Sequence, residues 1–133
     1  MLIPAVCLCG QEKAKARMKK IHRDNVEPFV TKDKAEIREL NHSKKMSLAE
    51  ATVKMGQATE LHYHARSEEI YYFLEGNGLM EIEGEKEEVS REHAIAIPPK
   101  KMHRITNLGN MPLRFLCFCS PPYSDEDTVL VGK

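Results

Sequence analysis

From Gly56 to Gly76 the chain reads GQATELHYHARSEEIYYFLEG. Within it, His62 and His64 are one residue apart, and Glu69 follows five residues after the second histidine. In a β-strand residues i and i+2 lie on the same face, so the two imidazoles are expected to project into one space. Imidazoles and carboxylates are ordinary ligands of transition metals. This stretch therefore predicts a strand that carries part of a metal site.

An alternation of apolar and polar residues continues on both sides of this stretch. Residues 47–55 alternate in this way and are expected to form a strand that ends at Gly56. Turns are expected at Gly76-Asn77-Gly78, as a hairpin, and at Glu83-Gly84-Glu85. Other strands are expected over 35–40, 59–64, 69–74, 79–83, 86–90, 94–97, 103–107 and 113–119. Short strands at this spacing predict an all-β fold, a small antiparallel β-barrel or sandwich.

The two ends of the chain give weaker signals. Pro28 argues against a central strand between residues 25 and 30. Ser124 is followed by acidic residues, which is typical of a helix N-cap and first turn, so a short helix is expected over 124–130. We expect residues 1–24 to be a leader or flexible N-terminal arm, and residues 25–133 to form one domain with a short C-terminal extension.

Composition excludes several classes of protein. The 133 residues carry 20 basic and 20 acidic side chains and are 41% hydrophobic. This length fits one domain, and no apolar run is long enough to span a bilayer. A zero net charge lacks the positive field that binds phosphate backbones. Neither a membrane nor a nucleic acid is an expected partner.

The cysteines form two Cys-x-Cys pairs, Cys7 with Cys9 and Cys117 with Cys119. This spacing matches neither the Cys-x-x-Cys motif nor a spread disulfide framework. Reduced thiols, and therefore a cytoplasmic protein, are expected. For Cys117 and Cys119 we favour core packing over a position at the metal pocket.

The spacing of glycines, histidines and glutamate in residues 56–76 resembles the first motif of the cupin superfamily. Pro98, His103 and Asn107 resemble its second motif. Two glycines of that second motif are replaced, by Glu92 and Lys100. Glycine supplies backbone freedom and no metal ligand, so these replacements bear on the turns more than on the ligands.

This resemblance implies a jelly roll, the double-stranded β-helix of cupins, around one divalent transition ion. The ion could be Fe, Mn, Ni, Cu, Co or Zn, because imidazole and carboxylate suit all of them. The ligands implied by the resemblance are His62, His64, Glu69 and His103. Two alternatives stay open, since a buried histidine is often only a hydrogen-bonded core residue, and Glu68 could face inward in place of Glu69. His22, His42 and His93 lie outside both motifs and are expected at the surface.

Tyr71 and Phe73 share the strand parity of Glu69 and are expected to line a substrate pocket beside the metal, whereas Tyr72 faces the other side. Core packing explains Tyr71 and Phe73 equally well. Residues 113–119 are apolar on both faces, so together with residues 35–40 they predict a homodimer contact.

The resemblance leaves the reaction open, because this fold hosts many activities. The leading hypothesis is a metal-dependent enzyme, an oxidoreductase of dioxygenase type that acts on a small oxygenated metabolite. One alternative is a sugar or sugar-phosphate isomerase or epimerase, for which Lys100, Lys101 and Arg104 are the cations nearest a ligand. The other alternative is a non-catalytic module that binds a small metabolite. No catalytic residue is assigned.

Overall fold

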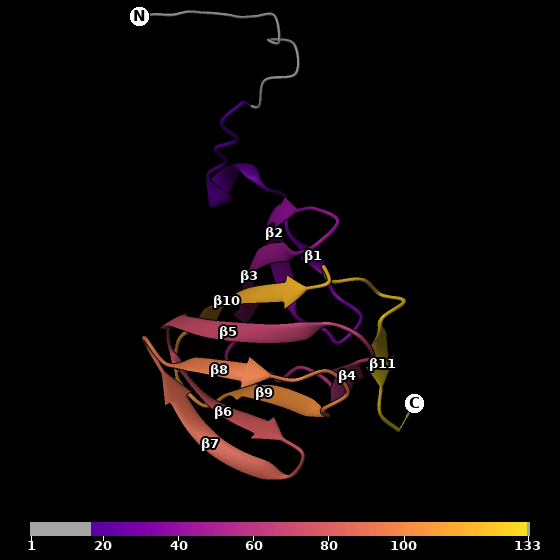
Figure 1. The fold of residues 1–133 in the computed structure, drawn as a ribbon. Coiled ribbons are helices and arrows are strands. Elements are labelled where there is room, and N and C mark those ends of the chain that lie inside the picture. Colours follow the sequence, from indigo (N-terminus) through magenta and orange to yellow (C-terminus); the bar gives the residue numbers. More distant parts are fainter. Residues whose placement is uncertain (1–16, 133) are drawn as a thin grey trace, which may run out of the picture.

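The structure is a computed structural model that describes residues 17–132, and Figure 1 shows its two packed β-sheets. One sheet has the strand order β1-β2-β3-β10-β5-β8, and the other has the order β11-β4-β9-β6-β7. All pairings are antiparallel. The strands are β1 (Phe29–Val30), β2 (Glu36–His42), β3 (Ser47–Val53), β4 (His62–His64), β5 (Glu68–Glu75), β6 (Asn77–Ile82), β7 (Glu85–Ser90), β8 (Ala94–Ile97), β9 (His103–Asn107), β10 (Leu113–Ser120) and β11 (Thr128–Leu130).

The expected all-β jelly roll is confirmed. A 3₁₀ turn, η2 (Arg23–Asn25), precedes the strands, and the described residues contain no α-helix. Within residues 17–132, no helix has the length and apolar character needed to cross a membrane.

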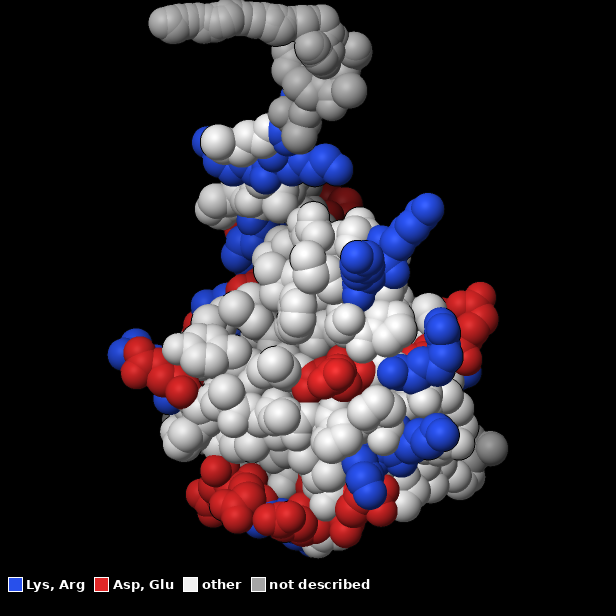
Figure 2. Space-filling view, viewed as in Figure 1, with Lys and Arg blue, Asp and Glu red and all other residues white. Residues whose placement is uncertain are grey.

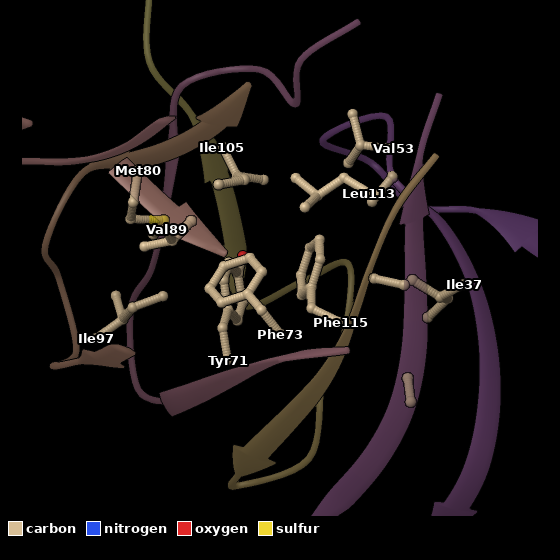
Figure 3. Close-up of a cluster of buried hydrophobic side chains, with 13 residues drawn as sticks. Ile37, Val53, Tyr71, Phe73, Met80, Val89, Ile97, Ile105, Leu113 and Phe115 are labelled. Carbon is tan, nitrogen blue, oxygen red and sulfur yellow. The ribbon is translucent and has the colours of Figure 1, made fainter. Parts of the chain in front are cut away.

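Inward-facing residues fill the space between the sheets, as the alternation predicts. Along β5, buried Glu69, Tyr71 and Phe73 alternate with exposed neighbours. Figure 3 shows Phe73 beside Phe115, and their rings are tilted by 42° with centroids 5.2 Å apart. Tyr71 lies 4.5 Å from the Phe115 centroid and 6.2 Å from that of His103. Aromatic packing therefore fills one end of the barrel, and Tyr71 marks the boundary with the histidines.

Two local expectations are wrong. Residues 124–130 do not form a helix: Ser124 Oγ accepts a hydrogen bond from Asp127 N, as a cap would, but Thr128–Leu130 then pair with β4 as β11. The open edge of β4 offers backbone partners that a single helical turn lacks. Gly76-Asn77-Gly78 is also no hairpin, because β5 and β6 belong to different sheets and the chain crosses between them at Gly76, with φ +95°.

The expected turn at Glu83-Gly84 is confirmed. Ile82 pairs with Glu85, and both turn residues have positive φ, 50° and 87°. Such a two-residue turn matches the right-handed twist of the two strands that it joins.

The segment before β1 contacts the outer face of the larger sheet. Arg23 Nε lies 2.5 Å from Glu50 Oε1, and Glu50 also pairs with Arg114 on β10. The backbone carbonyl of Arg23 accepts a hydrogen bond from Arg38 at 3.0 Å. Part of the segment assigned to the N-terminal arm is therefore tied to β2 and β3.

Candidate metal centre

Three histidines converge inside the barrel, where β4 and β9 lie side by side. His62 and His64 share the inner face of β4, and His103 stands directly opposite His62 on β9. The ring centroid of His62 lies 4.2 Å from that of His103 and 5.1 Å from that of His64. All three are buried, with at most 4% of their surface exposed. The alternation expected from the sequence thus places the three imidazoles in one space.

Glu69 reaches the same space from the other sheet. Its Oε1 lies 3.1 Å from His64 Nε2 and 3.2 Å from His103 Nε2. Glu69 is buried, whereas the neighbouring Glu68 is exposed, so Glu69 is the inward-facing glutamate. The structure therefore brings together all four residues proposed as ligands.

The Nδ1 atom of each imidazole is held by a hydrogen bond. His62 Nδ1 lies 2.6 Å from the Glu60 carbonyl, and His103 Nδ1 lies 2.9 Å from the Lys101 carbonyl. A carbonyl only accepts, so in both rings Nδ1 carries the proton. His64 Nδ1 lies 3.0 Å from Thr128 Oγ1, whose own hydroxyl donates to the Ser124 carbonyl.

Because the Thr128 hydroxyl proton is used in that bond, Thr128 Oγ1 accepts a hydrogen bond from His64 Nδ1. Nδ1 of His64 therefore carries the proton, as in the other two rings. In the neutral form each imidazole therefore leaves Nε2 without a proton, which is the arrangement found in metal-binding histidines. Nε2 of His64 and of His103 faces Glu69 Oε1, and Nε2 of His62 lies 3.4 Å from Asp33 Oδ2.

Two buried atoms at the centre have no hydrogen-bond partner among residues 17–132. They are Glu69 Oε1 and His103 Nε2, which face each other without hydrogen-bond geometry. A buried polar atom without a partner is costly. A carboxylate oxygen and deprotonated imidazole nitrogens are electron-pair donors, so a cation between them would satisfy both atoms. The residues present therefore fit a transition metal ion.

The electrostatics of the cluster depend on Glu69. Burial alone would raise the pKa of the Glu69 carboxyl, but His103 and His64 outweigh it and hold that pKa well below its usual range. Burial disfavours the protonated His64 imidazole, yet the Glu69 carboxylate raises its pKa overall. Burial lowers the pKa of His62. Glu69 is thus a charged carboxylate that attracts cations.

A cavity of about 30 Å³ adjoins the cluster. Tyr71 lines it, whereas Phe73 does not and lies fully buried in the aromatic core. Of the two residues expected to line a pocket, the structure therefore places one at the cavity. The volume has room for about two water molecules.

Several cavity residues were missed or misplaced by sequence reasoning. Asp33, in the loop before β2, is buried with Oδ2 3.4 Å from His62 Nε2, and no spacing in the sequence marks it. Tyr123 comes from the loop after β10, and its hydroxyl accepts a hydrogen bond from Lys32 N. Cys117 and Cys119 were assigned to core packing. Cys119 is buried and Cys117 is partly buried against the core, and both also line the cavity.

The surface residues were placed correctly. His22, His42 and His93 are exposed, as expected. Arg104 points away from the histidines and pairs with Glu81 at 3.1 Å. None of these residues contributes to the candidate site.

Comparisons with known proteins bear on the family and the fold of the chain. A family model described as a cupin domain matches residues 49–119. An uncharacterized protein of Methanocaldococcus jannaschii is 51% identical over 117 residues, which cover 84% of this chain and 94% of the relative. A tetracenomycin polyketide synthase protein of Streptomyces glaucescens is 33% identical over 66 residues, covering 50% of this chain and 44% of the relative.

A glucose-6-phosphate isomerase of Thermococcus gammatolerans is 42% identical over 65 residues, covering 44% of this chain and 34% of the relative. This chain therefore spans less than half the length of the Streptomyces and Thermococcus relatives.

Solved structures share the fold. The polyketide cyclase RemF from Streptomyces resistomycificus superposes with a TM-score of 0.75 at 24% identity, covering 88% of this chain and 87% of the cyclase. A predicted oxalate decarboxylase from Thermotoga maritima gives a TM-score of 0.70 at 23% identity, covering 77% of this chain and 98% of that protein. At this level of identity the likeness concerns the fold alone.

Proposed function

Because this chain belongs to the cupin superfamily, we propose that its cluster of three histidines and one glutamate binds one divalent transition metal ion. The observation that carries the proposal is the pair of buried, unpartnered atoms at the centre, Glu69 Oε1 and His103 Nε2. The ligands would be His62, His64, Glu69 and His103. When bound, such an ion supplies a Lewis acid with positions left for small oxygen ligands.

We further propose that the protein is an oxidoreductase of dioxygenase type acting on a small oxygenated metabolite. The described residues that line the cavity are mostly apolar or uncharged, and they include no lysine or arginine. Such walls favour a small ligand with few charges. Asp33, buried beside His62, is the carboxylate placed to accept a proton from a hydroxyl of the bound metabolite.

Sugar or sugar-phosphate isomerisation is the second candidate, and the similarity to the Thermococcus isomerase favours it. A phosphate would need cations near the metal. Arg104 is engaged by Glu81, and Lys100 and Lys101 are exposed and do not line the cavity. These placements make isomerisation the weaker candidate.

We also propose a homodimer formed through the outer face of the larger sheet. Ile70, Tyr72 and Phe118 lie on this face with 45%, 40% and 37% of their surface exposed. Phe118 is paired with Ile70, and Leu116 with Tyr72, so the apolar residues are contiguous across β5 and β10. Figure 2 shows that the region over β10, β5 and β8 carries mainly uncharged side chains. A contiguous apolar patch of this kind is typical of a protein interface.

A cytoplasmic location, where free Cys117 and Cys119 would stay reduced, completes the proposal.

Binding of a chelator tests whether the metal has open positions. A 2-oxo or 2-hydroxy acid should bind metal-loaded protein and leave metal-free protein unbound in calorimetry, because the ion is the chelating centre. Tyr71→Ala should change the chelator affinity without removing metal. Phe73→Ala is the matched control, because its ring lies in the core and should affect stability more than affinity.

Equal chelator binding by metal-loaded and metal-free protein would indicate a closed, structural metal shell and favour the non-catalytic binding module. Oxygen consumption by metal-loaded protein with a bound chelating substrate would separate the dioxygenase from the isomerase.

A further inference from the structure

The carboxylate of Glu69 faces two sets of ligand atoms, and the proposed histidine site uses one of them. Its Oε1 faces His64 and His103. Its Oε2 accepts hydrogen bonds from Cys117 Sγ at 2.9 Å and from Cys119 Sγ at 3.2 Å. The carboxylate therefore stands between a nitrogen set and a sulfur set.

The geometry of β10 holds the two thiols in place. Cys117 and Cys119 are two residues apart, so they share the inner face of the strand, and Cys119 is paired in register with Glu69. Both sulfurs and a carboxylate oxygen of Glu69 lie within 4.8 Å of one another. Three donor atoms at this separation are close enough to coordinate one ion together.

We propose that Glu69, Cys117 and Cys119 form a second metal position, selective for a thiophilic ion such as Zn(II), Cd(II), Co(II) or Cu(I). Sulfur ligands favour softer ions than the nitrogen and oxygen donors of the histidine site. In the metal-free protein both S–H groups donate to Glu69 Oε2, so their two protons stand where a cation would. An ion that binds there displaces those protons, because a coordinating thiol is deprotonated.

The bridging part of this inference rests on the proposed histidine site. With both positions filled, Glu69 would join two ions, one on each carboxylate oxygen. Two thiolates and one carboxylate would then balance most of the charge of two divalent ions inside the barrel. Buried charges require such pairing.

The cavity leaves room for the second ion. It is lined by both cysteines and by small side chains from the facing strands, including Ala49, which is paired in register with Cys117. The cavity volume of about 30 Å³ exceeds what one water needs.

Anaerobic titration with Co(II) tests the second site, because cobalt thiolates give a charge-transfer absorption that nitrogen and oxygen ligands do not. We expect the full-length chain to bind two Co(II) ions and to develop this absorption. The variant Cys117→Ser with Cys119→Ser should bind one ion without it. Serine is nearly the same size, and circular dichroism verifies that the variant is folded.

The other cysteine pair, Cys7 and Cys9, lies outside the described residues and supplies the matched control. The variant Cys7→Ser with Cys9→Ser should keep both cobalt ions and the absorption. Two results would overturn the inference: Co(II) bound by the wild type without the absorption, or an absorption that disappears in the Cys7/Cys9 variant.

Mn(II) distinguishes the two proposals, because it prefers nitrogen and oxygen donors. We expect one Mn(II) per chain in both the wild type and the Cys117/Cys119 variant. Suppose that the wild type binds no Mn(II) but still develops the cobalt–thiolate absorption. That result would contradict the histidine site and the bridge, whereas the thiol site would stand.

Discussion

At the scale of single residues, the two residues that replace glycines of the cupin pattern keep the backbone conformation that glycine favours. Glu92 and Lys100 stand where the second motif has glycines, and both have left-handed backbones, with φ of 73° and 69°. Lys100 N also donates to the His64 carbonyl at 2.8 Å, so this turn is bonded to the strand that carries two proposed ligands. A side chain in this region of φ costs about 1–2 kcal/mol.

Replacing Lys100 with glycine should therefore stabilise the protein. The free energy recovered by removing the left-handed strain exceeds the free-energy cost of the larger unfolded-state entropy of glycine. We therefore expect the free energy of unfolding to rise by about 0.5–1 kcal/mol. Chemical denaturation measures this gain. Lys101→Gly is the matched control and should lose about 0.5–1 kcal/mol, because Lys101 is not among the residues with positive φ. A Lys100→Gly variant as unstable as the Lys101 variant would contradict the account.

At the scale of strands, the period-two pattern predicted nine of the eleven strands to within a few residues, from β2 to β10. It missed β1 and β11, which are two and three residues long. Strands this short carry almost no alternation, and they form only because β2 and β4 offer open edges. The same limit explains the hairpin expected at Gly76, since local turn residues do not reveal which sheet the next strand joins.

The candidate site likewise contains residues that the sequence predicted and residues that it did not. Regular strands carry His62, His64, Glu69 and His103, so spacing and parity predicted their convergence. Asp33 and Tyr123 come from loops whose path depends on the assembled barrel, and the sequence held no signal for them. The pairing of Cys117 and Cys119 with Glu69 depends on the register between β10 and β5, which alternation alone does not fix.

The short strand β11 has a testable role at the site, through Thr128. Because Thr128 Oγ1 holds the Nδ1 proton of His64, Thr128→Val should lower the metal affinity by about 10–100-fold while the protein stays folded. Competition dialysis measures this affinity. Thr106→Val is the control, because Thr106 lies on the opposite face of β9 from His103. Equal affinities in the two variants would mean that Thr128 does not position His64.

At the scale of the whole molecule, the sandwich brings Glu69 from one sheet to the histidines of the other, so an intact site requires both sheets to pack correctly. The larger sheet also presents an exposed apolar patch on β5 and β10, formed by Ile70, Tyr72 and Phe118. Acidic side chains gather over β6 and β7 in the smaller sheet, at the bottom of Figure 2. These two surfaces therefore differ in chemistry, and the apolar patch is the one that we propose as the contact between two copies of the chain.

Light scattering at tens of micromolar should give the mass of a dimer. Phe118→Glu places a charge in the middle of the apolar face and should shift the protein to monomer, because burying an unpaired charge is costly. Leu108→Glu is the control variant. Leu108 is 51% exposed in the loop after β9, away from the apolar patch, so this variant should remain dimeric. A monomeric wild type, or a dimeric Phe118→Glu variant, would contradict an interface on this face.

The most direct test of the metal proposal is the Mn(II) content of the reconstituted protein, measured by elemental analysis after dialysis. The account predicts one Mn(II) per chain in the wild type and in His93→Ala, whose altered residue is exposed, and none in folded His103→Ala. Folded wild-type protein that takes up no Mn(II), or equal uptake by wild type and His103→Ala, would contradict it.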